Sequence, residues 1–562
     1  MYSASVLRFA LLFLVPASIL STLYLYFYPI FHLCAFPSPK ENTFSEYLNT
    51  VRQHTHFPYL ASDTHHIAPF RLLSFGDPQI EGDSSIPHLE TTNLPNLKKF
   101  WKHVQPINNT ISLQNLRYCL HDLIDFYLDD IPKSLGVWRK RLDHLGNDFY
   151  LGHIYRAMNW WTSPTHVTVL GDLIGSQWVN DNEFENRGWR YWNRVFRGGI
   201  KVEKELMYFD SKEFRDIQRL GRNEVSWARR IINIAGNHDI GYAGDISYAR
   251  TERFARIFGV PSYELRFQYP VGERNGLVAS EKPSVPELRI VVLNDLNLDI
   301  PAGSKELQEE TYKFLNTIIK TSYDVDRLAH FTLVLTHVPL FKKDGICTDG
   351  PFFKYYEGKF ENGVKEQNLL SSDASKILLE GIFGKSGNSN APGKGFGRGG
   401  IILNGHDHEG CDVFHYINQS VVDGPKWEAT TWQSALSSGI QNQPGIPNLR
   451  EITVRSMMGA YDGNVGLLSL WFDEESWAWK YEYTNCRLGK QHIWWVVHVL
   501  DLITCVILVC YGGSILAEKC SRPQLVLTTK LDHDFQASEK HSHVNTCKHV
   551  RKIELNRYNS TE

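Results

Sequence analysis

The chain has 562 residues, a formal net charge of -3, and 22% charged residues against 42% hydrophobic ones. This composition excludes a disordered chain and a protein embedded mainly in a membrane. The balanced charge gives no indication that the chain binds nucleic acid. Nine cysteines in a chain of this length are too few for a scaffold held together mainly by disulfides.

Two apolar segments predict membrane spans. The segment 9–31 has no charged residue and is long enough to cross about 30 Å of hydrocarbon. It ends in tyrosine and phenylalanine rather than in small residues, which favours an uncleaved anchor over a cleaved signal peptide. The segment 493–517 is also long enough, although it contains Asp501. We expect Asp501 to be tolerated near the membrane interface, with a role inside the membrane as the alternative.

These segments predict five parts of the chain. They are a short cytosolic N-terminus at 1–8, an anchor at 9–31, a lumenal domain at 33–490, a second transmembrane helix at 493–517 and a disordered cytosolic tail at 518–562. Possible glycosylation sites at Asn108 and Asn418 lie between the spans and favour a lumenal face for that domain. A third site, at Asn559, falls in the tail.

Five apolar runs between the spans have the composition of β-strands and end in polar residues. They are 71–76, 166–170, 230–235, 331–336 and 400–403, followed by Asp77 and Gln79, by Asp172, by Asn237, His238 and Asp239, by His337, and by His406 and His408. Strands that end together bring such side chains to one edge, where α/β sheets usually bind ligands. Carboxylate, carboxamide and imidazole groups without a thiolate cluster suit a catalytic centre for manganese, zinc, iron or magnesium better than a structural zinc site.

The order of these motifs resembles the calcineurin-like metallophosphoesterases over most of residues 68–485. Within that superfamily the chain is most similar to the membrane-bound phosphodiesterases that remove ethanolamine phosphate from glycosylphosphatidylinositol (GPI) anchors in the yeast endoplasmic reticulum (ER). The branch that acts on the second mannose looks nearest, and the branch that acts on the first mannose is the alternative.

The resemblance implies an α/β fold with α+β layering, in which a β-sandwich is flanked by helices, together with two transmembrane helices. It also implies two divalent metal ions, with manganese favoured and zinc, iron or magnesium as alternatives. Asp77, Gln79 and His408 would hold one ion, Asn237, His337 and His406 would hold the other, and Asp172 would bridge them. His238 would protonate the leaving oxygen, and Asp239 would orient its imidazole.

The chain departs from the family pattern at two positions. Gln79 stands where relatives frequently have histidine, and a carboxamide oxygen is a weaker, harder ligand. Gly175 stands where the family motif Gly-Asp-x-x-Asp ends in aspartate, which bears on the catalytic rate more than on metal binding. Ser176 and Gln177 are candidates to replace the missing carboxylate.

Three further features of the middle region carry predictions. Residues 84–165 predict a mostly helical insertion with a solvated face, and a cover over the site or a contact with lipid headgroups are the alternatives. Strands at 451–455, 465–472 and 477–483 predict a late β-meander that forms the second sheet. Because the loops after His337 and His408 would converge on the same metals, we predict a Cys347–Cys411 disulfide. Cys119 and Cys486 are further candidates for pairing.

The favoured function is a lumenal, metal-dependent phosphodiesterase of the ER membrane that trims GPI glycans and promotes the export of GPI-anchored proteins. Its partners would be the GPI glycan, membrane lipid and cargo receptors of ER export, and we expect no nucleic acid. The alternative is a trafficking scaffold with a weakened metal site, which Gly175 keeps open. A protein phosphatase of the soluble type is disfavoured, since such enzymes carry arginine in the second motif and typically lack flanking spans.

Overall fold

The computed structural model describes residues 2–39, 67–104, 113–207, 217–221, 225–270, 285–326, 329–418, 426–443 and 445–521. The predicted glycosylation sites at Asn108 and Asn559 and the predicted disordered tail from residue 522 lie outside these residues, as does the segment that follows Asn418. The chain divides into two compact units. One comprises Met1–Leu25 with Trp495–Glu562, and the other comprises Tyr26–Trp494.

A six-stranded sheet forms one layer of the larger unit, with the strand order β16-β15-β1-β2-β5-β3. Its strands are β1 (Phe70–Phe75), β2 (His166–Val169), β3 (Ile200–Lys201), β5 (Arg230–Asn233), β15 (Asn464–Asp473) and β16 (Ala478–Arg487). Strands β1, β2, β5 and β3 are parallel, and β15 is antiparallel to both of its neighbours. The sheet therefore delivers the C-terminal ends of β1, β2 and β5 to one edge.

An eight-stranded sheet forms the second layer, with the order β13-β12-β14-β11-β8-β7-β6-β4. Its strands are β4 (Gln218–Arg219), β6 (Tyr263–Gln268), β7 (Glu287–Val292), β8 (His330–Leu335), β11 (Gly399–Asn404), β12 (Cys411–Asn418), β13 (Lys426–Thr431) and β14 (Asn448–Thr453). The central strands β14, β11, β8 and β7 are parallel. A separate hairpin is formed by β9 (Phe353–Tyr355) and β10 (Val364–Gln367).

The main hydrophobic core includes side chains from both sheets. Phe70, Leu72 and Ile232 come from the first sheet, and Leu333 and Ile401 come from the second. All five are buried with no more than 1% of their surface exposed. Burial of such side chains contributes about 1.5–3 kcal/mol each, so this shared core holds the two layers together. The five strands predicted from the motifs are confirmed, and they belong to two sheets rather than one.

The predicted late meander is wrong as a separate second sheet. Strand β14 pairs with β11 and β12 in the eight-stranded sheet, whereas β15 pairs with β1 in the six-stranded sheet. Only the β15–β16 hairpin has the local pairing that the turn after Asp473 predicts. Strands β14 and β15 pair with strands that are far away in the sequence, and local turn signals carry no information on that pairing.

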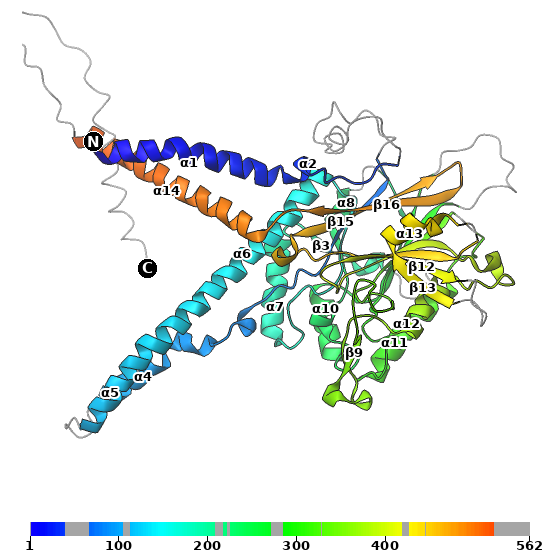
Figure 1. The fold of residues 1–562 in the computed structure, drawn as a ribbon, viewed down its shortest axis with the longest axis horizontal. Helices are drawn as coiled ribbons and strands as arrows, with labels where there is room; N and C mark the ends of the chain where they lie inside the picture. The colour runs from blue at the N-terminus through cyan, green and yellow to red at the C-terminus, as the bar shows by residue number, and fades with distance from the viewer. Residues whose placement is uncertain are drawn as a thin grey trace, which may run out of the picture. The chain divides into compact units, whose positions relative to one another are not determined.

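Helices surround the sheets (Figure 1). They are α7 (Asp181–Arg190), α8 (Val225–Arg229), α9 (Asn237–Ile240), α10 (Tyr248–Ile257), α11 (Lys305–Lys320), α12 (Ser372–Lys376) and α13 (Trp432–Ser438). The predicted helical insertion consists of α4 (Pro95–Val104), α5 (Leu113–Asp125), a π-turn at Phe126–Asp130 and the 32-residue helix α6 (Ile131–Thr162). Helix α4, helix α5 and the first part of α6 extend from the sheets of this unit as an arm (Figure 1).

Two disulfides lie in the larger unit. The predicted Cys347–Cys411 bond is confirmed, with Cα atoms 6.0 Å apart. A second bond, Cys34–Cys486, joins residues 452 positions apart in the sequence, and Cys34 was not among the predicted candidates. The candidate Cys119 is a free cysteine.

The smaller unit contains most of the two apolar helices, α1 (Tyr2–Tyr26) and α14 (Gln491–Ser521). Both are long and apolar enough to cross a membrane, over Ala4–Tyr26 and Gln491–Glu518. The predicted segment 9–31 is divided between α1 and the short helix α2 (Tyr28–Phe31). Asp501 of α14 accepts hydrogen bonds from the hydroxyls of Ser18 and Thr22 of α1. Its partner is therefore the other apolar helix, as is usual for a polar group between two such helices.

Candidate metal centre

Loops from both sheets bring the predicted site residues together. Asp77 follows β1, Asp172 follows β2 and Asn237 follows β5, while His337 follows β8 and His406 follows β11. Asp77, Asp172 and His406 have positive φ angles of 33°, 48° and 70°. Such φ values are uncommon for residues other than glycine because they cost conformational energy. They persist where the surrounding structure holds a functional group in place.

The His337 imidazole is buried at the centre of this cluster. Its Nδ1 lies 2.8 Å from the Leu170 carbonyl oxygen, which can only accept, so Nδ1 carries the proton. Burial lowers the pKa of His337, which leaves Nε2 as a lone pair. This Nε2 lies 2.9 Å from Asn237 Oδ1 and 3.4 Å from Asp172 Oδ1. Three electron-pair donors facing one another at these distances repel unless a cation lies among them.

His406 completes this group. The donor atoms of Asp172, His337 and His406 lie within 4.8 Å of one another, as a metal site requires. Nε2 of His406 donates to the Gln367 carbonyl oxygen at 2.8 Å, which fixes its tautomer in the way that second-shell carbonyls orient metal-binding histidines. Burial and the nearby His337 lower the pKa of His406 to about 3, so its ring is neutral at physiological pH and available as a ligand.

A second group of donors surrounds Asp77. Its carboxylate oxygens lie 3.7 Å from His408 Nε2 and 3.8 Å from His337 Nδ1. Gln79 reaches the same place, since its amide nitrogen lies 3.0 Å from His408 Nε2 and donates to Asp172 Oδ2 at 3.2 Å. Rotation of this amide by 180° would present its oxygen at the same position. All the predicted metal ligands are therefore brought together.

The charges of the cluster fit a bound cation. Asp77 is fully buried, and no side chain in the described part of the protein donates a hydrogen bond to its carboxylate. Burial and the nearby Asp172 raise the pKa of Asp77 well above its usual value. Burial acts in the same direction on Asp172, but His238, His337 and His406 outweigh it and lower the pKa of that group. Oxygen and imidazole donors with uncompensated carboxylate charge are a suitable site for divalent ions.

Glycines allow the loops to approach this closely. A Cβ atom on Gly171, whose φ is 95°, would lie 2.2 Å from His337 Nδ1. A Cβ atom on Gly405 would lie 2.7 Å from Asp77 Oδ1. Both contacts are far inside van der Waals distance, so neither position accepts a side chain without movement of a metal-binding residue.

His238 lies beside the cluster with 37% of its side chain exposed. Its main-chain N–H donates to Asp172 Oδ1 at 2.8 Å, and its Nε2 lies 3.7 Å from Asp172 Oδ2. Its Nδ1 has no hydrogen-bond partner in the described residues. His238 is thus placed next to the metal-binding atoms and remains accessible to a ligand.

The predicted role of Asp239 is wrong. Its carboxylate accepts hydrogen bonds from the main-chain N–H groups of Gly236, Leu173 and Ile174 at 2.8, 3.1 and 3.0 Å, rather than from the His238 imidazole. Asp239 immediately precedes the last residue of α9, and its side chain turns back to the loop after β2. Asp239 therefore positions the two metal-binding loops that carry Asp172 and Asn237.

Gly175 lies close to its neighbours, because a Cβ atom placed there would be 3.3 Å from Glu81 Cγ and 3.4 Å from the Gln79 carbonyl oxygen, so a side chain at this position requires a small shift of those groups. Ser176, one of the two candidate replacements, accepts a hydrogen bond through its Oγ from the Trp178 N–H, and Gln177 accepts one from Arg253 through its main-chain carbonyl. The replacement of the missing carboxylate by either residue stays a prediction.

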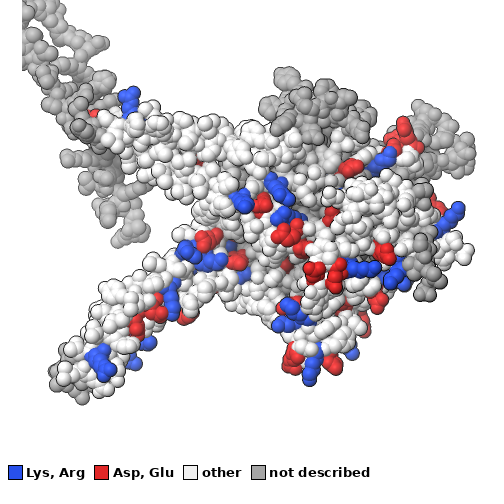
Figure 2. All heavy atoms as spheres, in the orientation of Figure 1, with Lys and Arg blue, Asp and Glu red and all other residues white. Residues whose placement is uncertain are grey.

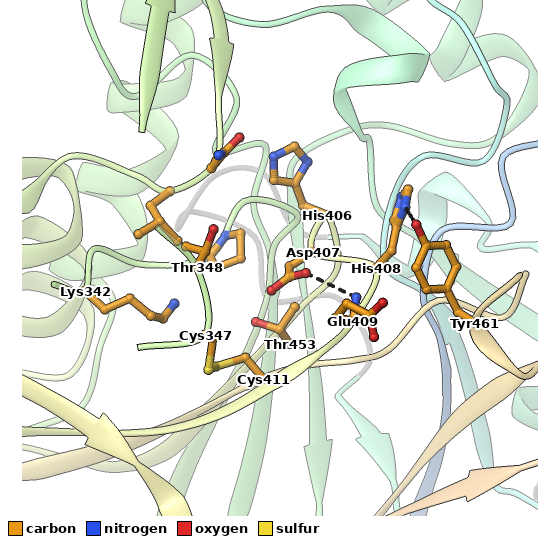
Figure 3. A pocket seen from close by; sticks show the side chains of 13 residues that line it. Lys342, Cys347, Thr348, His406, Asp407, His408, Glu409, Cys411, Thr453 and Tyr461 are labelled. Carbon is orange, nitrogen blue, oxygen red and sulfur yellow. Dashed lines mark hydrogen bonds between the residues drawn. A yellow bond between two sulfur atoms is a disulfide. The ribbon is translucent and has the colours of Figure 1, made fainter. Parts of the chain in front are cut away.

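A cavity of about 270 Å³ adjoins His406 and His408. Figure 3 shows Asp407, Glu409 and Thr453 around it, together with the Cys347–Cys411 disulfide. Thr453 is 3% exposed, and its hydroxyl has no hydrogen-bond partner in the described residues.

Sequence reasoning missed two residues that support the site. Tyr461 places its hydroxyl 3.2 Å from His408 Nδ1. Glu451 is buried and accepts hydrogen bonds from the Leu340 main chain and the Asn404 side chain, at 2.6 and 2.7 Å. It thereby joins the loop after His337 to the end of the strand before His406. Neither residue belongs to a local motif, and both reach the site only through sheet pairing.

Comparisons with known proteins agree with this geometry. The chain is 34% identical to Protein TED1 of Saccharomyces cerevisiae over 66% of this chain and 80% of that protein. It is 22% identical to Metallophosphoesterase 1 of Danio rerio over 50% of this chain and 60% of the relative. It is also 23% identical to Cell division control protein 1 of Saccharomyces cerevisiae, over 42% and 40% of the two chains. No protein-family model matches the chain.

The chain belongs to the metallophosphoesterase superfamily, as its motifs predicted. The mixed α/β sheets with flanking helices and the group Asp172, His337 and His406 are consistent with a phosphoesterase that uses divalent metal. The two apolar helices indicate association with a membrane.

Proposed function

We propose that the chain is a membrane-anchored, dinuclear phosphodiesterase that removes ethanolamine phosphate from a mannose of GPI anchors in the ER lumen, the second mannose being favoured. By this trimming it promotes the export of GPI-anchored proteins, with cargo receptors of ER export as further partners. The observation that carries the proposal is the convergence of lone-pair donors from five strand ends, centred on His337 Nε2, in a chain of this superfamily.

Two divalent ions, with manganese favoured, fit the donor set. Asp77, Gln79 and His408 would hold one, and Asn237, His337 and His406 would hold the other. Asp172 would serve both, because its two oxygens face both groups. When bound, such ions supply an activated water and neutralise the phosphoryl oxygens. The glycines at 171 and 405 keep the ligand-bearing loops close enough to do this.

His238 is the residue that would meet the phosphate. It is accessible, its backbone is fixed by Asp172, and its imidazole lies beside the metal-binding atoms rather than among them. In this position the protonated imidazole can donate to the oxygen that leaves phosphorus, a contribution of about 10²–10⁴-fold in rate. Asp239 acts on this step only through the backbone of the loops that it holds.

The cavity beside His406 supports ethanolamine as the group recognised. Asp407 and Glu409 line it with two carboxylates, of which Glu409 is paired with Arg455 at 3.0 Å, and the Thr453 hydroxyl, which has no partner in the described residues, offers an acceptor. Lys342 also lines the cavity, but its charge is paired with buried Glu451 at 3.2 Å. An ammonium group on a short chain attached to the phosphate would find opposite charge there.

The disulfides support a lumenal location for residues 33–490. Cys34–Cys486 and Cys347–Cys411 lie between the two apolar helices, and disulfides persist in oxidising compartments such as the ER lumen. With two spans, both tails would be cytosolic. Protease added to sealed microsomes should remove only the tails, and digestion of the catalytic region without detergent would contradict the arrangement.

The activity is tested with the purified full chain, His238→Ala and the control His88→Ala, whose side chain is 56% exposed and lies 3.9 Å from Glu90. Each is loaded with Mn²⁺ and incubated with GPI glycans that carry ethanolamine phosphate on the first or the second mannose. Mass spectrometry should show loss of ethanolamine phosphate, and turnover by His238→Ala should fall about 10²–10⁴-fold. If the metal-loaded parent protein trims neither glycan yet supports export in cells, the scaffold hypothesis replaces the enzyme.

A further inference from the structure

The helical arm presents a row of exposed apolar side chains. On α5 the row consists of Leu113, Leu116, Leu120 and Ile124, whose exposed fractions are 86%, 59%, 60% and 47%. The residues recur every three or four positions, so they share one face of the helix. Helix α4 packs on α5 without covering this row.

Helix α6 continues the same row beyond the π-turn. Leu135, Trp138, Leu142 and Leu145 recur at the same spacing and are again mostly exposed. We call these eight residues of α5 and α6 the apolar stripe. From residue 113 to residue 145 it extends about 50 Å along the helices at 1.5 Å per residue. Isolated exposed leucines are ordinary, whereas a continuous row of this length marks a surface that contacts something apolar.

Charged residues of α6 flank the stripe and fix the orientation of the helix: Lys133 and Lys140 lie on the side away from it, and Arg141 lies at its margin, with its guanidinium 5.4 Å from the centre of the Trp138 ring. Arg141 pairs with Asp83 at 2.7 Å, and Lys140 lies 3.5 Å from Glu81, both in the segment that follows β1. Lys133 pairs with Asp129 along the arm at 2.6 Å. Figure 2 shows charged side chains along the arm beside an uncharged surface. The apolar stripe is therefore held outward by these contacts.

The C-terminal part of α6 contacts Tyr26 and Gly489, which lie at the two points where the larger unit meets the apolar helices in the sequence. Trp161 donates to the Tyr26 carbonyl oxygen at 2.7 Å, and the rings of His153 and Tyr26 lie 4.9 Å apart. Tyr150 donates to the Gly489 carbonyl oxygen at 2.7 Å, just before α14 begins. His153 stands four residues after Phe149, which itself follows Leu145 by four. The face that carries the stripe thus continues to the His153–Tyr26 contact.

We propose that the apolar stripe lies in the lipid interface of the membrane that α1 and α14 cross, so that the arm rests on the bilayer surface. Two observations select lipid as the occupant: the face of the stripe continues through Phe149 to His153, which packs on Tyr26 where the chain enters its first apolar helix, and charged residues lie on the side of the arm away from the stripe. The proposal rests on the two helices being membrane spans and not on the phosphodiesterase activity.

The test places the photoreactive residue benzoylphenylalanine at position 142, and separately at position 138, of the full chain in microsomes. The matched control carries it at position 133 on the charged side. After irradiation we expect phospholipid adducts at 142 and 138, at least five times more abundant than at 133. The same adducts should form after reconstitution into phosphatidylcholine vesicles, where lipid is the only partner. Formation of both disulfides, read on a non-reducing gel, shows that each variant is folded.

Several results would overturn the proposal. An adduct between two copies of the chain would show that the stripe is a dimer surface, and an adduct with another protein would show that it binds a partner. Equal lipid labelling at 133 and 142, or none at 142 and 138 in a folded variant, would show that the stripe faces water. None of these outcomes depends on GPI trimming, so the two proposals fail separately.

Discussion

The strand-end loops and the helical arm depart from the usual distribution of polar and apolar groups in opposite ways. In the loops, fully buried Asp77 has a carboxylate to which no side chain of the described residues donates, and in the arm Leu113 is 86% exposed. Buried polar groups normally have partners, and long apolar rows are normally covered. Each departure therefore indicates a partner outside the chain, a cation in the first case and lipid in the proposal for the second.

The largest effect is expected at Asp172, whose oxygens face both groups of metal ligands. Asp172→Asn should lose most of its bound metal and lower the rate of phosphodiester cleavage by roughly 10³-fold or more, as loss of several kcal/mol of charge stabilisation requires. Elemental analysis and single-substrate kinetics on the same preparation measure both. Native protein that is free of metal and fully active would refute the metal centre.

A variant at Asp239 distinguishes two roles for this residue, which are positioning the loops and orienting the His238 imidazole. Asp239→Ala leaves three buried N–H groups without their acceptor, which costs about 3–9 kcal/mol at about 1–3 kcal/mol each. The thermal midpoint should fall sharply, while the pH dependence of whatever activity remains should keep its shape. An unchanged midpoint with a displaced pH profile would restore the orienting role that the sequence predicted.

Glu451 gives a stability effect that depends on pH. Burial alone would raise its pKa, but Lys342 and His415 outweigh burial and lower it to about 2 from 4.5. A depressed folded-state pKa contributes stability that is fully present above pH 4.5 and is lost as the pH falls toward 2. Glu451→Gln should therefore cost about 3 kcal/mol at pH 7 and progressively less below pH 4.5. The difference in thermal midpoint between the parent protein and Glu451→Gln, measured at pH 7, 4 and 3, should shrink as the pH falls. A difference that stays constant with pH would contradict it.

The smallest effect is expected in the arm. Leu142→Glu in detergent should leave turnover unchanged and alter the free energy of unfolding by less than about 0.5 kcal/mol, because the side chain is exposed and makes no contact that the fold needs. Scanning calorimetry and initial rates in detergent provide the measurement. A large loss of stability in detergent would mean that the stripe packs on protein and that lipid is not its partner.

The sequence predicted the centre better than the arm. The motifs from Asp77 to His408 located the residues that the structure brings together, because short strands followed by polar residues are local signals. Gly236-Asn237-His238-Asp239 was correctly located, but the direction of the Asp239 side chain depends on the loop after β2, which is remote in the sequence. The pairing of β15 with β1 is equally long-range. In the arm, the spacing of Leu113, Leu116 and Leu120 was present in the sequence, but spacing alone does not show whether an apolar face is covered by protein.

The Cys34–Cys486 bond closes almost the whole larger unit into a covalent ring. If one peptide bond between these cysteines were cut, the two fragments would stay joined, and each would remain attached to its own apolar helix. A nicked molecule would thus be retained by the membrane and would separate on a gel only after reduction. The bond gives the chain a tolerance to single proteolytic cuts that the non-covalent contacts of the sheets alone would not guarantee.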